Sequence, residues 1–434
     1  MTTSATITAR ARALRRGLAL LSVGALSAGL LAGCSSGSDE SDGTLRITLA
    51  NHGWTTLIQE KLPEFEKETG LEVEVNTYGE EQLSEQYNVK LNGGDSSIDV
   101  MMYRPPSETM LYAQNGWLED LTDRVESSKT IDWDDYYASS VESVTDHDAV
   151  YGVPLVTEQQ VLYYRKDLLE AAGIEVPKTL EELEAAAAEL TTDDTYGLVS
   201  RGKQFSQAAP ILHTFGADWI VDGKAALNSP EAIEAYEYYG GMLKNYGPPG
   251  VTNMAWPEAI AVFAQGKAAF YTDANVLYPN VTDPENSSVS DKVGFAVIPG
   301  GPKGPLPYNV TSWGLAVNAS SKQKDNAWKF IEWATSPEMS LEAQQAGQLS
   351  ARKSVWDNPE SLSGLPEDLA EVTKESIEID GGRDRAPVVQ VKKASDIYGA
   401  PWTAAMTGGD VKAAADKANE EFQRFLDEEA ARAH

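Results

Sequence analysis

Cysteine is nearly absent from this sequence: Cys34 is the only one, so no disulfide bond can form within the chain. The four histidines, His52, His147, His213 and His434, show none of the spacings of zinc or calcium sites. Phosphate-binding glycine loops and the G-x-S-x-G turn of serine hydrolases are also missing. These absences predict a protein without a metal ion or another cofactor. A pair of catalytic carboxylates stays open, because the chain has 66 Asp and Glu residues.

Positive charge is scarce. Against 66 acidic residues stand 35 Lys and Arg residues, which gives a formal net charge of −31. The only charges before Cys34 are four arginines, so a chain that begins at Cys34 carries −35. Such a surface repels nucleic acid and anionic lipid headgroups, and it disfavours an acidic ligand. We therefore expect a neutral ligand and no nucleic-acid partner.

Long apolar runs are scarce as well. Residues 18–31 are too few and too rich in glycine for a comfortable membrane-spanning helix. They follow a basic region and end in LAGC at residues 31–34, which resembles the lipobox of bacterial lipoproteins. The resemblance implies that residues 1–33 are a signal peptide, and that acyl chains such as palmitate on Cys34 hold the exported protein at the extracytoplasmic face of the cell membrane. The alternative, an uncleaved anchor, also leaves the domain outside the cell.

The rest of the chain is typical of a two-lobed α/β protein. Residues 34–43 predict a flexible tether, because no apolar side chain follows Cys34 there. From Thr44 to about residue 102, the apolar pattern alternates strand, helix, strand, helix, strand. A chain of 434 residues exceeds what one hydrophobic core usually fills, so we expect two lobes. The predicted lobes are residues 44–153 with 314–355, and residues 154–313 with 356–434.

The segment from residue 151 to residue 190 has the clearest local signals. β-branched and aromatic residues between 153 and 164 predict a strand, although Pro154 restricts its first part to a sheet edge or a connection. Residues 166–172 predict a helix that Gly173 ends. Thr179 and Glu182 fit a capping box, because each side chain can pair a backbone N–H of the first helical turn.

Ligands of open α/β sheets bind at the carboxyl ends of the strands. Asn51 and Trp54 follow the first predicted strand, and Tyr103 and Arg104 follow the third. We therefore expect both loops to face the same crevice. The acidic, aromatic residues 132–137 predict a solvated surface turn rather than a site.

The order of motifs along residues 151–183 carries a family resemblance: Tyr-Gly-Val-Pro, Tyr-Tyr-Arg-Lys-Asp-Leu-Leu, Ala-Gly, Pro-Lys-Thr and Glu-Glu-Leu. It resembles the first inter-lobe crossing of bacterial extracytoplasmic solute-binding proteins, in the carbohydrate-binding group that includes maltose-binding protein. Residues 263–270 and 294–302 are similar to recurrent motifs of that group. The three expected crossings lie near Val153, near Trp313 and at residues 351–355.

The resemblance implies a type II periplasmic-binding-protein fold, with two α/β lobes joined by a hinge of crossing segments. It implies a monomer that closes around a neutral sugar, polyol or short oligosaccharide and delivers it to the membrane subunits of an ABC importer. It implies no catalysis. The first loop, Asn-His-Gly-Trp, departs from maltose-binding protein, which disfavours maltose itself.

A sugar presents C–H faces and hydroxyl groups, which aromatic rings and planar polar side chains bind well. Glu158 resembles a sugar-binding carboxylate of the family, and Gln159 beside it offers an amide. A single tryptophan is more often a core residue than a platform, so only aromatic residues at element ends are included. The predicted ligand-binding residues are Asn51, Trp54, Gln82, Tyr103, Arg104, Glu158, Gln159, Trp219, Trp256, Asp273, Trp313 and Arg352.

The residues alone are also compatible with two functions from other classes. A secreted glycoside hydrolase would also use aromatic platforms, together with two carboxylates. A surface lipoprotein without a transport role would need no crevice.

Overall fold

The computed structural model describes residues 43–203, 205–379 and 381–432. The predicted signal peptide, Cys34 and all of the tether except Gly43 lie outside the described residues. Within the described ranges, no helix combines the length and the apolar character that a membrane span requires. These described residues form one compact unit.

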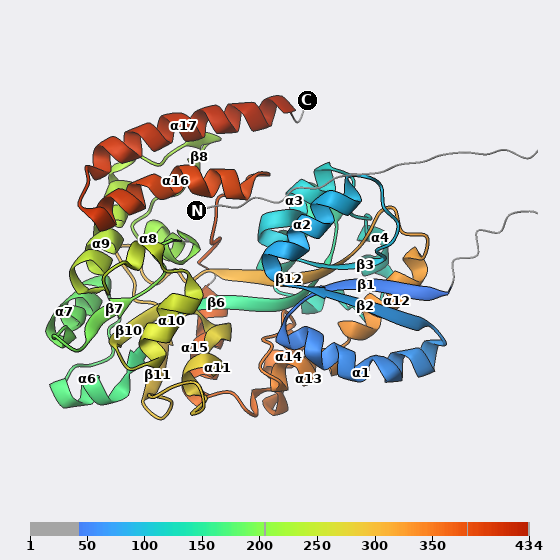
Figure 1. The fold of residues 1–434 in the computed structure, drawn as a ribbon, viewed down its shortest axis with the longest axis horizontal. Coiled ribbons are helices and arrows are strands. Elements are labelled where there is room, and N and C mark those ends of the chain that lie inside the picture. Colours follow the sequence, from blue (N-terminus) through green and yellow to red (C-terminus); the bar gives the residue numbers. More distant parts are fainter. Residues whose placement is uncertain (1–42, 204, 380, 433–434) are drawn as a thin grey trace, which may run out of the picture. The chain divides into compact units, whose positions relative to one another are not determined.

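The sheet depends on two long strands, β6 (Val153–Arg165) and β12 (Asn309–Val317), which Figure 1 shows running between two groups of elements. The strand order is β2-β1-β3-β12-β6-β10-β7, and β11 also pairs with β6. The strands are β1 (Thr44–Ala50), β2 (Glu72–Tyr78), β3 (Val100–Tyr103), β4 (Thr145–Asp146), β5 (Ala149–Val150), β6, β7 (Tyr196–Val199), β8 (Ile220–Val221), β9 (Lys224–Ala225), β10 (Ala268–Ala274), β11 (Val293–Val297) and β12.

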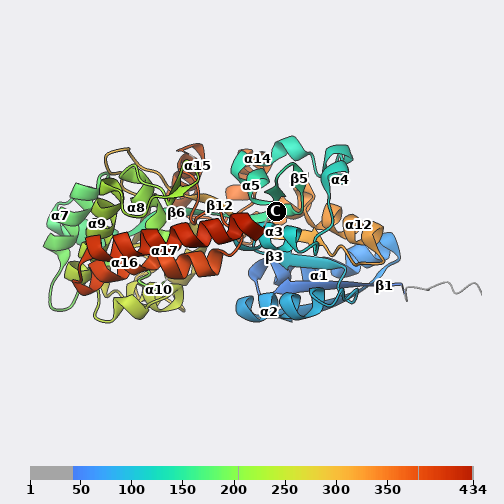
Figure 2. The same cartoon turned by 90° about the horizontal axis from the view of Figure 1, so that it is seen from above.

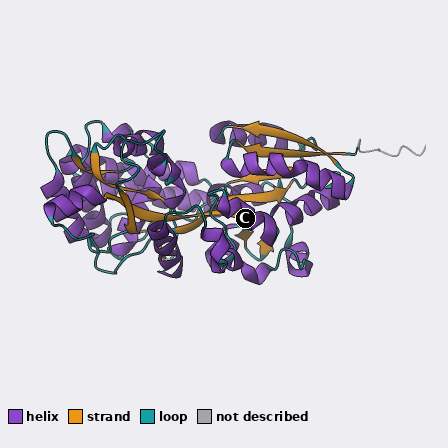
Figure 3. Ribbon diagram, turned by 90° about the horizontal axis from the view of Figure 1, so that it is seen from below, coloured by secondary structure: helices purple, strands orange, loops and turns teal. Residues whose placement is uncertain are grey.

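Helices lie on both faces of this sheet, as Figure 3 shows. They are α1 (Gly53–Thr69), α2 (Glu80–Leu91), α3 (Pro105–Gln114), α4 (Thr122–Ser127), α5 (Ala138–Ser143), α6 (Lys166–Ala172), α7 (Leu180–Leu190), α8 (Ala209–Thr214), α9 (Pro230–Tyr246), α10 (Trp256–Ala264), α11 (Pro279–Thr282), α12 (Lys324–Ala334), α13 (Pro337–Gln345), α14 (Lys353–Asp357), α15 (Glu367–Ile379), α16 (Val391–Thr407) and α17 (Val411–Arg432). Short 3-10 turns are η1 (Trp133–Asp135), η2 (Phe205–Ala208), η3 (Val251–Asn253), η4 (Asn275–Leu277) and η5 (Pro359–Leu362).

Strand β6 has different partners along its length. Residues 153–159 pair with β12, whereas residues 160–165 pair with β10 and β11. Pro154 lies in the first part, opposite Gly314, where the register of the β6–β12 pair shifts. Proline lacks the N–H that a second neighbouring strand would need, so it is tolerated where β6 has β12 on one side.

The apolar core is divided. One cluster draws its buried residues from residues 45–156 and 313–351, and two others draw theirs from residues 161–425. We call residues 44–153 with 314–355 the first half and residues 154–313 with 356–432 the second half. These names follow the predicted lobes, whose boundaries we carry forward as a proposal.

Most elements agree with the sequence patterns. Thr179 caps α7 in a capping box with Glu182, and Gly173 ends α6 in the left-handed conformation. Helix α1 runs through Pro63 as one element. The third crossing is displaced: backbone pairing to β6 uses Leu349 and Ser350, just before the predicted residues.

Three features, two helices of the second half and one segment of the first half, escaped the sequence patterns. Helices α15 and α16 have no predicted counterpart, because Pro and Asp residues around them suggested loops. The segment 132–137 is not fully solvated: Tyr136 is buried, and the carboxylate of Asp135 accepts a hydrogen bond from Arg352.

Helix α16 packs against α9 on one side and α17 on the other; Figure 2 shows α16 and α17 side by side. The α9–α16 contact is close at Gly240, because a Cβ atom there would collide with Ala405. The next residue, Gly241, has open space around its Cα atom. Two adjacent glycines of one helix therefore have opposite environments.

We predict that Gly240→Ala lowers the free energy of unfolding by about 1–3 kcal/mol, because α9 and α16 must move apart. Gly241→Ala is the matched control and should raise it by about 0.5–1 kcal/mol, since alanine favours the helix over glycine. Urea unfolding followed by circular dichroism measures both. Equal effects of the two substitutions would contradict the close packing.

Candidate functional site

Glu158 lies on β6 opposite Val310 of β12, where the chain passes between the halves. The Ser312 hydroxyl on β12 donates to the carbonyl oxygen of Val156 at 3.3 Å. Burial raises the pKa of Glu158 to about 7, with smaller contributions from the carboxylates of Asp273 and Asp384, while the guanidinium of Arg201 and the hydroxyl of Ser312 oppose the shift. This carboxyl group therefore changes its protonation near neutral pH.

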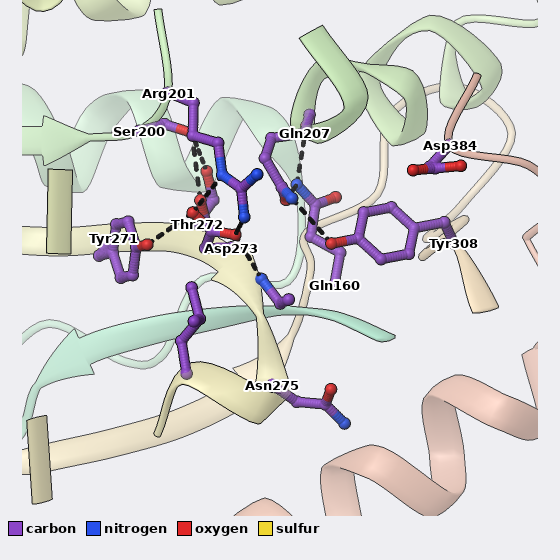
Figure 4. Close-up of polar contacts among 12 residues, drawn as sticks. Gln160, Ser200, Arg201, Gln207, Tyr271, Thr272, Asp273, Asn275, Tyr308 and Asp384 are labelled. Atoms are coloured by element: carbon purple, nitrogen blue, oxygen red, sulfur yellow. Dashed lines mark hydrogen bonds and ion pairs between the residues drawn. The ribbon is translucent and has the colours of Figure 1, made fainter. Parts of the chain in front are cut away.

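Arg201 and Asp273 form a fixed ion pair in the second half (Figure 4). Strands β7 and β10 run parallel, and Arg201 follows the end of β7 while Asp273 lies near the end of β10. The Arg201 Nε and Nη2 atoms donate to the two carboxylate oxygens of Asp273 at 2.8 and 2.5 Å. The Tyr271 hydroxyl donates to the same carboxylate at 2.5 Å. Asp273 is fully buried, so this arrangement holds the guanidinium in one orientation.

A chain of amide and hydroxyl groups lies beside this pair (Figure 4). Gln160 Nε2 donates to the Gln207 side-chain oxygen at 3.0 Å, and Gln207 Nε2 donates to the Tyr308 hydroxyl at 2.8 Å. Asp384, which Figure 4 also shows, pairs with Arg385 through both carboxylate oxygens. We call Glu158, Arg201, Asp273, Tyr308, Asp384 and Arg385 the polar cluster.

The first half contributes Arg104 and His52, and the ring of His52 packs on Trp313 at the border of the two halves. Arg104 Nη1 donates to Glu80 at 2.7 Å, and its Nη2 donates to Ser84 and Glu108. The rings of His52 and Trp313 have their centroids 5.7 Å apart. Burial lowers the pKa of His52 to about 4, so this ring is neutral at physiological pH.

A cavity of about 360 Å³ adjoins the polar cluster. It is lined by the first residues of α3, by α5 and β4, by Asn309 and Val310, and by residues 382–388. Residues of both halves meet around it, since Arg385 donates to the Ser107 hydroxyl and Arg383 pairs with Glu142. Asp384 and Arg385 belong to both the cavity lining and the polar cluster. This volume lies within the range of small-molecule sites.

The structure brings some of the predicted residues to this region. Glu158 and Asp273 are in the polar cluster, Trp313 packs on His52, and Arg104 lies at the start of α3 beside the cavity. Trp256 is 37% exposed at the start of α10. Asn51 and Gln82 are exposed residues of the first half.

Other predicted residues are placed in the interior. Trp54 and Tyr103 belong to the first core, and Trp219 packs on His213 and Tyr398 in the second core. Gln159 is buried, with its side chain hydrogen-bonded to Asn275 and Asn309. Their burial favours a packing role over ligand contact.

Arg352 is 1% exposed, and its contacts are all structural. Its guanidinium donates to the carbonyl oxygens of Thr335 and Thr130 and to the Asp135 carboxylate. It also lies over the Tyr136 ring at 4.6 Å. These contacts fasten the start of α14 to the first half, which is a different role from the predicted one.

The sequence reasoning missed Arg201, Tyr308, Asp384 and Arg385. Arg201 follows the end of strand β7, so the rule that selected Arg104 could have selected it too. Asp384 and Arg385 lie outside any helix or strand, and no local pattern marks them. In the described part of the chain, no group of three or more His, Cys, Asp or Glu residues could hold a metal ion.

We predict that Asp273→Asn lowers the free energy of unfolding by about 3 kcal/mol, because it leaves the charge of Arg201 without its carboxylate in a buried setting. Asp167→Asn is the matched control: Asp167 forms the same two-pronged pair with Arg165 but is 37% exposed. The Asp167→Asn substitution should lower the free energy of unfolding by less than about 1 kcal/mol. Chemical denaturation compares the two, and equal losses would contradict the burial argument.

The raised pKa of Glu158 makes stability depend on pH. Between its ordinary pKa of 4.5 and about 7, the folded protein holds a proton that the unfolded chain has lost. Folding is therefore favoured at the low end of this window, and stability falls as pH rises through it. Glu158→Gln should remove this fall, which thermal unfolding of both proteins from pH 5 to pH 8 measures. Parallel curves for the two proteins would show that Glu158 titrates normally.

Comparisons with known proteins agree with this architecture. Residues 53–340 match the model of the bacterial extracellular solute-binding protein family. The chain is 34% identical to the mannitol-binding protein of Pseudomonas aeruginosa over 241 residues, which cover 53% of this chain and 54% of that protein. The chain thus spans about half the length of that relative. It is 28% identical to the erythritol/L-threitol-binding protein of Mycolicibacterium smegmatis, over 73% of this chain and 72% of that protein.

Solved structures share the fold along nearly their whole length. A ribitol complex of an ABC transporter solute-binding protein from Agrobacterium radiobacter has a TM-score of 0.77 and 29% identity, and covers 88% of this chain and 98% of its own. The maltose-bound MalE3 of T. maritima has a TM-score of 0.77 and 27% identity. The alignment covers 88% of this chain and 100% of the MalE3 chain. The expected type II periplasmic-binding-protein fold is confirmed. The chain therefore belongs to the bacterial extracellular solute-binding protein family and is a binding protein rather than an enzyme.

Proposed function

We propose that this protein captures a neutral polyol or sugar in the cavity beside the polar cluster and delivers it to an ABC importer. The observation that supports this most is the polar cluster itself. Its guanidinium and carboxylate groups are held in place by each other, and they adjoin a cavity of about 360 Å³. Hydrogen-bond donors and acceptors that are held in fixed positions can bind the hydroxyl groups of a sugar or polyol.

The names of similar proteins favour polyols within this class. One relative is named for mannitol and another for erythritol and L-threitol, and one structural neighbour holds ribitol. The exposed indole of Trp256, and the edge of the largely buried pair of His52 and Trp313, would contact the C–H faces of such a ligand. A short oligosaccharide stays within the proposal, because the maltose-bound neighbour shares the fold.

Hinge closure is the proposed mechanism. A ligand that touches both halves binds the closed form more tightly than the open form, so it shifts the population toward closure. The bending would occur in β6, β12 and the Leu349–Ser350 crossing, the paired segments that join the halves. Contacts such as Arg385 with Ser107 would form and break with this motion.

We also propose that the protein is exported, stays monomeric, and is held at the membrane through acylated Cys34. This rests on the lipobox-like residues 31–34 and the long polar tether that follows them. Acyl chains contribute about 0.8 kcal/mol per buried CH₂, so several chains would retain a soluble domain at the membrane surface. Mass spectrometry of the membrane-extracted protein would detect the acylated cysteine at the new N-terminus.

A panel of monosaccharides, disaccharides and polyols tests the binding proposal. Thermal unfolding should shift upward with one chemical class, since a ligand at 100 times its Kd stabilises the folded state by about 2.7 kcal/mol. The ligand should be recovered intact after incubation, because binding involves no chemistry. A shift with none of the panel would contradict a carbohydrate or polyol ligand.

We predict that Trp256→Ala weakens ligand binding by about 1–3 kcal/mol and leaves the ligand-free melting temperature nearly unchanged, because the indole is already exposed. Trp333→Ala is a suitable control, since Trp333 packs on Phe65 and Phe330 in the first half. It should lower the melting temperature without changing affinity. Titration of the intrinsic fluorescence gives both affinities, and unchanged binding by Trp256→Ala would remove this residue from the site.

A further inference from the structure

A series of hydrogen-bonded side chains runs through the interior and ends at the wall of the cavity. It begins at Thr373 on α15, continues through Asn275 directly after β10 (Figure 4) and Gln159 on β6, and ends at Asn309, the first residue of β12. All four side chains are buried, and Asn309 also lines the cavity. Four elements that are distant in sequence are therefore joined by side-chain hydrogen bonds. We call these four residues the amide chain.

One backbone group fixes the orientation of every amide in the amide chain. The N–H of Gln159 can only donate, and it donates to the Oδ1 atom of Asn275 at 3.0 Å. The Nδ2 atom of Asn275 then lies on the other side of its amide group. There it donates to Gln159 Oε1 at 2.6 Å and to Thr373 Oγ1 at 3.1 Å. Because Gln159 Oε1 is used as an acceptor in this way, Gln159 turns its Nε2 atom toward Asn309.

Asn309 receives this last hydrogen bond and keeps a free donor. Gln159 Nε2 donates to Asn309 Oδ1 at 2.7 Å, so the carbonyl side of the Asn309 amide faces Gln159. The Nδ2 atom of Asn309 makes no hydrogen bond to any residue that the structure describes. An amide nitrogen carries two N–H bonds and accepts none. The cavity wall therefore contains a neutral donor whose orientation the interior determines.

Charged groups elsewhere in the cavity lining already have partners. Arg383 pairs with Glu142, and Arg385 pairs with Asp384. A ligand that bound these groups would have to compete with their present partners. The Nδ2 atom of Asn309 has no protein partner to lose, so a hydrogen bond to a ligand replaces only one to water.

We propose that Asn309 donates a hydrogen bond to an oxygen atom of the ligand, and that Gln159, Asn275 and Thr373 are positioning residues that keep its amide group from rotating. This rests on the proposed function. A hydroxyl oxygen of a polyol, or the ring oxygen of a sugar, can accept from the amide nitrogen. Because the amide is already held in one orientation, little conformational entropy is lost when the bond forms. The site therefore prefers a ligand with an oxygen atom at this place over an analogue that has a hydrogen atom there.

Isothermal titration calorimetry with D-mannitol and ribitol tests the contribution of Asn309. A similar protein is named for mannitol, and a structural neighbour holds ribitol. Asn309→Leu removes the donor at nearly constant volume and should weaken binding about three- to tenfold, as expected for one hydrogen bond. Asn318→Leu is the matched control, because Asn318 directly follows β12, is 1% exposed and donates to the carbonyl oxygens of Asp95 and Ile98. It should lower the melting temperature and leave both affinities unchanged.

A double-mutant cycle tests the positioning role. Gln159→Leu leaves Asn309 in place but free to rotate, so it should weaken polyol binding by about threefold. The double variant Gln159→Leu/Asn309→Leu should bind as Asn309→Leu does, because Gln159 acts on the ligand only through Asn309. A purely structural role of Gln159 would instead lower stability and leave affinity unchanged.

Nuclear magnetic resonance of the parent protein tests the amide nitrogen itself, whether or not the variants fold. With asparagine labelled by nitrogen-15, saturating D-mannitol or ribitol should shift the Nδ2 signal of Asn309 and slow the exchange of its protons with solvent. Asn275 is the internal reference, because its Nδ2 atom already donates to Gln159 and Thr373. Its protons should exchange slowly with and without the polyol.

The outcomes distinguish this inference from the proposed function. If no polyol or sugar of the panel binds, the proposed function fails. If a polyol binds while the Nδ2 signal and proton exchange of Asn309 stay unchanged, or if Asn309→Leu binds it as tightly as the parent protein, then the role assigned to Asn309 is wrong and the binding function stands. Equal losses of affinity in Asn309→Leu and Asn318→Leu would also contradict it, because a general loosening of β12 would then explain both. Independent effects of Gln159→Leu and Asn309→Leu would contradict the positioning role.

Discussion

The sharing of strand β6 between two different sets of neighbours is the constraint on which the structure depends. Its first residues pair with β12 on the side of the sheet that belongs to the first half, and its last residues pair with β10 and β11 in the second half. Glu158 lies where one set of partners gives way to the other. A residue at that junction lies close to both halves. Polar side chains of both halves can therefore lie near it, and a ligand bound there could contact both.

Pairing of charges explains why the charged side chains of the polar cluster are stable in the interior without a ligand. Buried guanidinium groups are tolerated because each has a carboxylate and further acceptors in fixed geometry. Two arginines in the molecule illustrate the two uses of this arrangement. Arg201 lies in the cluster beside the cavity, whereas Arg352 is enclosed by Thr335, Thr130 and Tyr136 and serves to fasten the chain. The same residue type thus belongs to the proposed binding site in one place and to a structural contact in another.

Much of the fold could be predicted from local sequence, and less of the site. Short-range signals were reliable because they depend only on neighbouring residues. The capping box of Thr179 and Glu182 forms within one helical turn, and the end of α6 depends on the left-handed backbone conformation of Gly173. The rule for strand ends selected Arg104, which the structure places at the start of α3, directly before residues that line the cavity. Burial of Trp219 and Arg352 could not be predicted, because it depends on α16 and on the segment 130–136, which are distant in sequence. Asp384 and Arg385 reach the site from an irregular segment that no pattern marks.

The central claim is that an uncharged, hydroxyl-rich ligand draws the two halves together around the polar cluster. Spin labels at Val89 and Val221, which are 75% and 51% exposed on α2 and β8, measure this most directly in a chain whose Cys34 is replaced by serine. Pulsed electron spin resonance gives the distribution of distances between the two labels. The account predicts that a saturating polyol shifts this distribution to a new, narrower one. A polyol that binds and leaves the distribution unchanged would contradict it.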